Sequence, residues 1–243
     1  MSEPAPDPQL AELRTLLTTA TQRLLGSTIV VTDEEWAAPS RLPGWTRAHV
    51  ATHVARQADA LARLVDGATT GEPQPMYASP EARTAEIEDG AGRTGLELQT
   101  DLDTSAERLT EAFERLDHVE ADLARVGAGW STSVEMRGGL VVPARLLPVG
   151  RLFEVEIHHV DLDAGYTPRE WPGSFVVATV EALRVRAPGV TLLATDLGRS
   201  WHAERGRVTV SGPGPRIAWW LSGRGRGEGL TSNGGDLPRI QEW

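Results

Sequence analysis

The segment at residues 154–166, EVEIHHVDLDAGY, places two adjacent histidines and four carboxylates within its first ten positions. Its other residues before Gly165 are apolar, and their spacing predicts a helix over 148–164. A histidine or carboxylate that is buried without a partner costs free energy, so polar residues of a packing helix need partners or contact with water. The segment therefore predicts a bundle helix that carries a polar site.

Helical geometry divides the polar residues of this segment between two faces. At 100° per residue, one apolar arc of the helix is formed by Phe153, Ile157, Val160 and Ala164. A second apolar arc is formed by Val155 and Leu162. Between these arcs lie Glu154, His158 and Asp161, with Arg151 at the edge. The opposite side carries Glu156, His159 and Asp163. We therefore expect His158 to point into the bundle beside Glu154, and His159 to face solvent.

The pair formed by Glu154 and His158 has two interpretations. In a purely structural role, a neutral His158 or an ion pair with Arg151 would compensate the buried carboxylate. Alternatively, the Glu-x-x-x-His spacing places two metal ligands one turn apart on the same helix face. Asp161 would then either orient a ligand or have a local structural partner. This segment alone leaves both interpretations open.

A second helix contributes another histidine. In residues 42–67, LPGWTRAHVATHVARQADALARLVDG, a Pro-Gly turn precedes a helix that Thr46 caps and Gly67 ends. The helical pattern places His53 at the margin of the helix face that points into the bundle. His49 lies closer to the polar arc, so we expect it to be a capping or surface residue.

Three residues combine into a candidate site. His53 alone fits a hydrogen-bonded core histidine, but His53, Glu154 and His158 together favour a three-ligand metal site. Two histidines and one carboxylate leave a fourth coordination position open, which is typical of catalytic rather than structural zinc. His118 and His202 have no comparable neighbours in the sequence.

The rest of the N-terminal part is mainly helical. Apolar periodicity predicts further helices over 9–25, 79–90 and 96–125. Residues 127–150 are punctuated by glycine and proline and predict a crossover loop with a strand at 140–142. These elements predict a four-helix domain over residues 1–165.

The sequence pattern changes after Gly165. We predict a helix within 171–186, three short strands within 190–212, a helix over 215–224 and a flexible end over 225–236. These elements predict a small C-terminal α/β domain over residues 166–243. The fold class is therefore α+β.

Composition excludes several functions. The formal charge of −10 argues against a nucleic-acid or anionic-membrane surface. We find no membrane-spanning run and no signal peptide, so we expect a cytoplasmic protein. All 24 basic residues are arginine, which excludes a Schiff base formed by lysine. Cysteine is also absent, so any thiol used in catalysis must come from outside the chain.

Three segments resemble the mycothiol-dependent maleylpyruvate isomerases. They are LPGWTRAHVATHVARQADAL, MYASPEARTAEIEDGAGR and EVEIHHVDLDAGYTPREWP, at residues 42–61, 76–93 and 154–172. The resemblance implies a DinB-like four-helix bundle followed by a small C-terminal α/β domain. It also implies a zinc ion held by a histidine of the second helix and the Glu-x-x-x-His pair of the fourth.

The family's functional residues map onto this chain individually. The zinc ligands correspond to His53, Glu154 and His158. The family also uses an arginine of the C-terminal domain, for which Arg224 is the best match and Arg226 lies two residues away. Arg83 and Arg93 are the next candidates for binding an anion.

The resemblance implies conversion of maleylpyruvate, a small dianion, to fumarylpyruvate with zinc, or another divalent metal, and mycothiol. We expect the protein to be a monomer. A thiolate adds across the double bond, the resulting single bond rotates, and elimination leaves the trans product. The alternatives are a mycothiol S-transferase, which stops at the adduct, and a non-catalytic bundle whose metal is structural. An arginine that faces the metal would favour catalysis on an anion.

Overall fold

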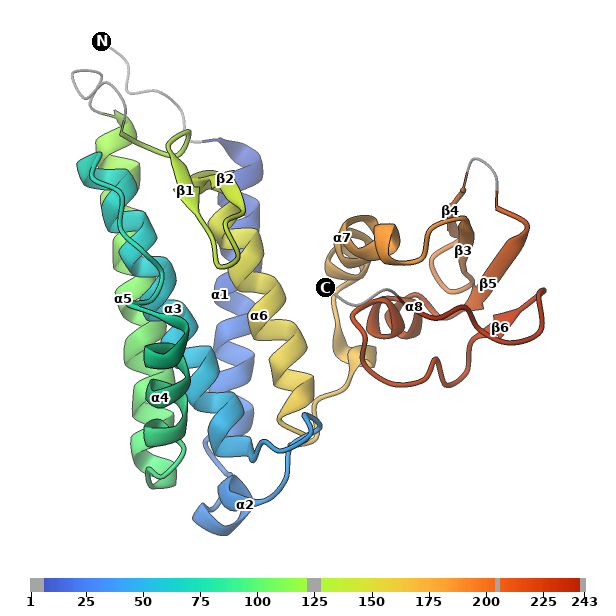
Figure 1. Cartoon of the computed structure of the whole chain (residues 1–243), viewed down its shortest axis with the longest axis horizontal. Coiled ribbons are helices and arrows are strands. Elements are labelled where there is room, and N and C mark those ends of the chain that lie inside the picture. Colours follow the sequence, from blue (N-terminus) through green and yellow to red (C-terminus); the bar gives the residue numbers. More distant parts are fainter. Residues whose placement is uncertain (1–6, 122–127, 204–205, 241–243) are drawn as a thin grey trace. The chain divides into compact units, whose positions relative to one another are not determined.

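The computed structural model describes residues 7–121, 128–203 and 206–240. Contacts divide the chain into two compact units, Met1–Gly165 and Tyr166–Trp243, and each unit has its own core. The first unit is helical and the second combines helices with a mixed sheet, so the predicted α+β class is confirmed (Figure 1). In the described parts of the chain, no helix is both long and apolar enough to cross a bilayer.

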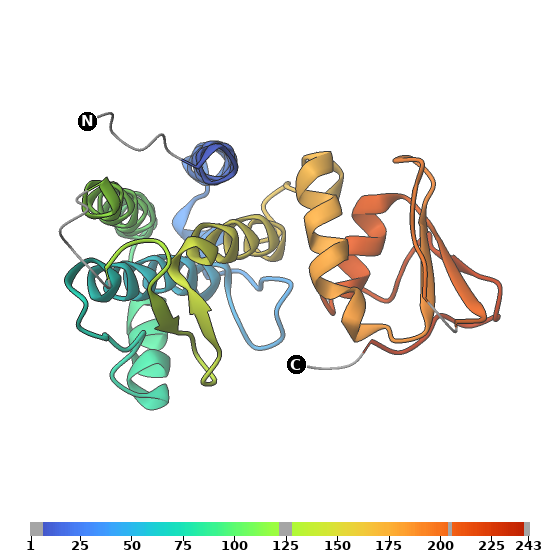
Figure 2. The same ribbon diagram turned by 90° about the horizontal axis from the view of Figure 1, so that it is seen from above.

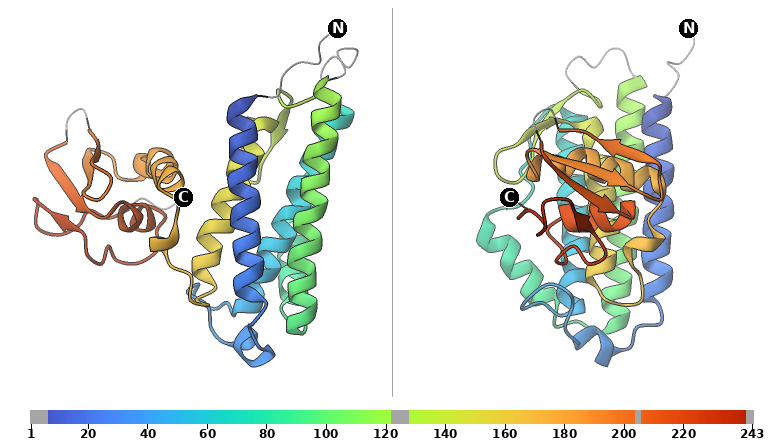
Figure 3. Two further views of the ribbon diagram at one scale, coloured as in Figure 1. Left: turned by 180° about the vertical axis from the view of Figure 1, so that it is seen from behind. Right: turned by 90° about the vertical axis from the view of Figure 1, so that its right-hand side faces the viewer.

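Four long helices form the first unit. They are α1 (Pro8–Thr28), α3 (Arg47–Thr70), α5 (Gly95–Ala121) and α6 (Leu147–Asp161). Helix α3 contacts both α5 and α6, and α1 also contacts these two helices, so the four surround one core. Figure 2 shows the bundle from above and the left panel of Figure 3 shows it from behind.

Shorter elements complete this unit. Helix α2 (Asp33–Ala37) precedes α3, and α4 (Pro80–Gly90) packs on α3. An antiparallel hairpin of β1 (Ser133–Glu135) and β2 (Val141–Pro143) leads through the 3-10 turn η1 (Ala144–Leu146) into α6. The sequence predicted only one of these two strands. The predicted end of the helix at 122–125 lies outside the described residues.

Local sequence determines where α3 and α4 begin. Thr46 accepts a hydrogen bond from the backbone of His49, and the His49 side chain accepts one from the backbone of Thr46, which is a reciprocal capping arrangement. This confirms His49 as a capping residue. Ser79 caps α4 through its hydroxyl, which accepts a hydrogen bond from the backbone nitrogen of Ala82, and Pro80 occupies the first helical position.

The prediction that Gly67 ends α3 is wrong, because the helix continues to Thr70. Gly71, at φ 78°, provides the left-handed cap instead. Gly67 is needed for close packing. A side-chain carbon there would lie 2.9 Å from the carbonyl oxygen of Glu72 and 3.0 Å from the nitrogen of Gln74. The glycine therefore lets the following loop fold back onto α3.

The second unit is built on a four-stranded sheet of order β4-β3-β5-β6. Its strands are β3 (Val190–Ala194), β4 (Arg199–Trp201), β5 (Val208–Gly212) and β6 (Thr231–Ser232). Strands β3 and β5 are parallel, and the other two pairings are antiparallel. Helix α8 (Gly214–Leu221) packs on β3 and β5, and α7 (Gly173–Leu183) packs on α8.

Short 3-10 turns flank α7, namely η2 (Pro168–Glu170) and η3 (Arg184–Arg186). The predicted flexible end at 225–236 contains β6, which corrects that prediction. Val210 pairs with Ser232, and the side chain of Asn233 accepts a hydrogen bond of 2.7 Å from the backbone nitrogen of Thr209. Strand pairing and a side-chain hydrogen bond supply these contacts, which a glycine-rich composition does not reveal.

Candidate metal centre

The structure brings His53 of α3 together with Glu154 and His158 of α6. Their ligand atoms all lie within 4.8 Å of one another. Oε2 of Glu154 is 3.2 Å from Nε2 of His53 and 3.2 Å from Nε2 of His158. The two imidazole rings are nearly perpendicular, with centroids 4.7 Å apart. Three donor atoms from two helices therefore converge on one point.

The two imidazoles, rather than burial, keep the central carboxylate ionised. Burial alone would raise the pKa of Glu154, but the imidazoles of His158 and His53 lower it well below its usual range. The group is therefore a carboxylate at neutral pH. Its Oε2 is shielded from water and faces the two imidazole nitrogens, each at 3.2 Å. A cation bound between the three donor atoms would neutralise the charge of this oxygen.

The two histidines have different surroundings. Burial lowers the pKa of His53 despite the nearby Glu154, so its imidazole is neutral at pH 7. Burial also acts to lower the pKa of His158, but the carboxylates of Asp161 and Glu154 outweigh it and raise this pKa to about 9. A divalent cation would replace the proton that these carboxylates attract. The donor set thus fits a metal such as zinc.

Asp161 is placed to orient His158. Its side chain is fully buried, and Oδ2 lies 2.9 Å from Nδ1 of His158. A carboxylate at this position favours a proton on Nδ1 and leaves the lone pair of Nε2 directed at Glu154. The backbone also holds the residue, because the carbonyl of Asp161 accepts a hydrogen bond from the nitrogen of Arg41.

We expect Asp161→Asn to weaken metal binding by roughly 10- to 100-fold, the usual effect of losing a residue that orients a ligand. The amide can accept the Nδ1 proton but carries no negative charge. Competition titration with Zn²⁺ and a chromophoric chelator measures the change. Asp163→Asn is the control, because Asp163 is exposed and pairs with Arg41 at 2.5 Å. Equal losses in the two variants would rule out a specific role for Asp161.

Arg151 lies inside the bundle rather than at the edge of the helix face. Its side chain is 2% exposed, and its Nη1 donates hydrogen bonds of 2.7 Å to the carbonyl of Val54 and to Oε1 of Gln57. Burial lowers its pKa to about 10, and the charge of Glu154 acts against this shift. The guanidinium is therefore charged at neutral pH and connects α6 to α3 beside His53.

The prediction that Glu156 and His159 face solvent is wrong, because both side chains are 1% exposed. Glu156 pairs with Arg23 of α1 at 3.2 Å, and Nε2 of His159 lies 2.6 Å from Oγ of Ser27 in the same helix. Helix α1 covers this side of α6, which a helical projection cannot reveal.

Phe153, Ile157 and Ala164, predicted to be core residues, are only half-buried. Asp163 is exposed as predicted.

Two residues next to the metal centre come from segments to which the helical patterns assigned no role. The ring of Trp45 lies edge-on to that of His53, with centroids 5.6 Å apart. Nη2 of Arg83, in α4, lies 3.2 Å from Nδ1 of His53. Both residues fall within the segments that carry the family resemblance, and from the sequence Arg83 was only a candidate for binding an anion.

Arg83 also lines a cavity of about 840 Å³. The cavity lies between the loop at 71–79, the first turns of α4 and the β1–β2 hairpin. Tyr77 of this loop packs between two guanidinium groups, 5.7 Å from Arg83 and 5.9 Å from Arg63. A space of this size is typical of small-molecule sites.

The other candidate residues lie apart from the centre or in the second unit. His118 contacts the carbonyl of Glu114 and His202 contacts Ser200, so neither belongs to the cluster. Arg224 lies just after α8, where its Nη1 donates a hydrogen bond of 3.1 Å to the carbonyl of Ser222. That Arg224 faces the metal centre remains a prediction.

Comparison with known proteins identifies relatives of this chain. Residues 16–163 match the model of the mycothiol maleylpyruvate isomerase N-terminal domain. A crystal structure of the mycothiol-dependent maleylpyruvate isomerase is 33% identical, covers 96% of this chain and 97% of its own, and superposes with a TM-score of 0.84. A histidine-to-alanine mutant of the isomerase has the same identity and coverage and a TM-score of 0.83. No curated protein sequence matches.

Proposed function

Because this chain belongs to the mycothiol maleylpyruvate isomerase family, we propose that it isomerises maleylpyruvate to fumarylpyruvate with mycothiol as the thiol. The observation that supports this most directly is the convergence of His53, Glu154 and His158 within 4.8 Å. At 33% identity the family relationship alone does not determine the substrate, so the proposal also rests on the chemistry of the site.

The residues of the centre fit a catalytic metal. His53, Glu154 and His158 would hold a divalent cation, most simply Zn²⁺, which would keep an external thiol in its thiolate form at neutral pH. One carboxylate and two neutral imidazoles leave the bound cation with a net positive charge, which favours an anionic ligand. Three protein ligands also leave a coordination position open.

The surrounding residues hold these ligands in place. Asp161 keeps the proton of His158 on Nδ1, 2.9 Å from its carboxylate. Arg151 connects the backbone of Val54 to α6, which limits movement of the two helices relative to each other. Trp45 packs against His53 and restricts its ring. The centre is thus organised before any ligand enters, as catalysis by positioned groups requires.

An ultraviolet assay of the zinc-loaded protein with maleylpyruvate and mycothiol tests the proposed function. We expect maleylpyruvate to be consumed and fumarylpyruvate to form only when both the metal and mycothiol are present. If the protein conjugated mycothiol to an alkyl halide but left maleylpyruvate unchanged, the S-transferase alternative would replace isomerisation. If neither reaction occurred with a stably bound metal, the centre would be structural.

In the second unit, we expect Arg224 to bind the keto-acid end of the substrate. Arg224→Leu should lower kcat/KM by roughly 10²-fold or more, the usual cost of removing a donor that stabilises developing charge. Its metal content should be unchanged because no ligand is altered. Arg226→Leu is the matched control and should have a much smaller effect. Near wild-type activity in both variants would assign the anion-binding role to another residue.

A further inference from the structure

Arg83 lies between the candidate metal centre and the cavity of about 840 Å³. Its side chain is half-buried and comes from α4, which packs on α3. The guanidinium donates to Nδ1 of His53 at 3.2 Å and lies 5.7 Å from the centre of the Tyr77 ring. A molecule that extends from the cavity toward the metal centre would therefore meet a positive charge.

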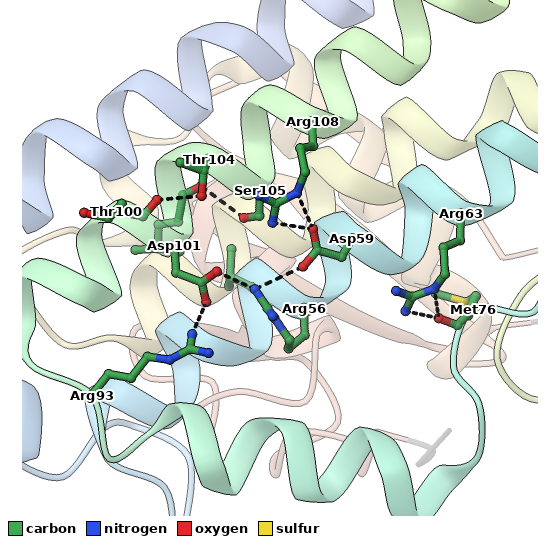
Figure 4. A network of polar contacts seen from close by, with 12 residues as sticks. Arg56, Asp59, Arg63, Met76, Arg93, Thr100, Asp101, Thr104, Ser105 and Arg108 are labelled. Atoms are coloured by element: carbon green, nitrogen blue, oxygen red, sulfur yellow. Dashed lines mark hydrogen bonds and ion pairs between the residues drawn. The ribbon is translucent and has the colours of Figure 1, made fainter.

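Neighbouring arginines already have anionic partners, as Figure 4 shows. Arg56 pairs with Asp59 at 3.0 Å and also with Asp101. Arg93 pairs with Asp101 at 2.5 Å, and Arg108 pairs with Asp59 at 2.7 Å. These arginines are neutralised by two aspartates on the facing surfaces of α3 and α5.

Arg63 and Arg83 have different partners. Arg63 donates two hydrogen bonds to the carbonyl of Met76, one of them at 3.0 Å (Figure 4). Within the described parts of the chain, Arg83 forms no ion pair with a carboxylate, and its hydrogen bond to His53 is to a ring nitrogen, Nδ1. Arg83 therefore combines a charge without an anionic partner with a position at both the cavity and the metal centre.

A metal on His53 would remove the acceptor that Arg83 uses. An imidazole that binds a cation through Nε2 carries its proton on Nδ1, because only one ring nitrogen of a neutral imidazole has a free lone pair. Nδ1 of His53 could then not accept a hydrogen bond from Arg83. The half-buried guanidinium would then lose one acceptor, and an incoming anion would restore the lost interaction.

We propose that Arg83 binds a carboxylate of the substrate beside the metal centre. The guanidinium fork matches a carboxylate, with which it forms two parallel charge-assisted hydrogen bonds. The proposal rests on the proposed function, whose substrate has two carboxylates. Arg224 is predicted to bind the keto-acid end, so Arg83 would bind the carboxylate at the other end and help to select dicarboxylates over monocarboxylates.

Calorimetric titration of the zinc-loaded protein with maleate, in the absence of any thiol, tests this role without turnover. Loss of a charge-assisted carboxylate contact should weaken maleate binding in Arg83→Gln by roughly 10- to 100-fold. Arg83→Lys should retain part of the affinity, because lysine keeps the charge but not the fork. Arg108→Gln is the control, because Arg108 already pairs with Asp59 at 2.7 Å, and this variant should bind maleate as the wild type does. The zinc affinity of each variant is measured in parallel.

Three outcomes would overturn the role of Arg83. The first is a wild-type protein that does not bind maleate, and the second is an Arg83→Gln variant that binds it as tightly as the wild type. The third is a variant that loses zinc affinity but, once loaded, binds maleate normally, because Arg83 would then only position His53. Maleate binding that depends on Arg83 in a protein that fails to convert maleylpyruvate would reject the isomerase function and leave the anion site intact.

Discussion

Replacing His158 by alanine should remove the bound metal and the isomerase activity, whereas replacing the adjacent His159 should preserve both. His158 contributes one of three donor atoms, and without it the half-buried carboxylate of Glu154 keeps only His53 as a partner. The loss of metal affinity should exceed the roughly 10- to 100-fold that is usual for residues that only support a ligand. Elemental analysis and the ultraviolet assay measure the two effects.

His159→Ala is a stringent control because this residue is also buried. Its ring contacts Ser27 of α1 at 2.6 Å, on the side of α6 away from the metal centre. We expect the variant to keep its zinc but to lose about 1–3 kcal/mol of stability, measured by denaturant unfolding. If His159→Ala lost the metal and His158→Ala retained it, the assignment of the two histidines to opposite sides of α6 would be wrong.

Isomerisation should depend completely on an added thiol. The chain contains neither cysteine nor lysine, so it has no thiol or amine side chain to act as a nucleophile. Extensively dialysed, zinc-loaded protein should therefore be inactive with maleylpyruvate, and mycothiol should restore activity in a saturable manner. The rate of maleylpyruvate loss, followed as a function of mycothiol concentration, measures this dependence.

Alkylation provides a control for this dependence. Protein treated with N-ethylmaleimide and then freed of the reagent should regain full activity with mycothiol, because it has no cysteine to modify. If N-ethylmaleimide is left in the assay, it should consume the mycothiol and stop the reaction. Activity in thiol-free protein that still carries its zinc would contradict a mechanism based on thiol addition.

Features that depend on residues close in the chain could be predicted from the sequence. The i, i+4 spacing of Glu154 and His158 places them on the same face of any α-helix that contains them. Capping by Thr46 and Ser79 depends on a hydroxyl and a backbone nitrogen three residues later, so the starts of α3 and α4 were predictable. The α+β class followed from helical periodicity before Gly165 and short strands after it.

Features that depend on which surfaces meet could not be predicted in this way. The helical projection of α6 assigned Glu156 and His159 to solvent, because it carries no information on how many neighbours surround a helix. Both α1 and α3 pack against α6, so polar residues on two of its sides are buried and each side has its own partners. Gly67 was read as a helix end for the same reason, although the loop that approaches it explains the glycine.

By itself, the sequence determined the helices, the α+β class and the alignment of Glu154 with His158, because these follow from local backbone geometry and hydrophobic periodicity. The sequence also grouped His53 with that pair as a hypothesis, but only the tertiary structure shows that their donor atoms lie within 4.8 Å of one another. The tertiary structure alone also shows that Asp161 lies beside Nδ1 of His158 and that Arg83 of α4 contacts His53. The physical reason is that a polar contact between distant residues forms only after whole helix faces have packed, and many side chains together determine that packing.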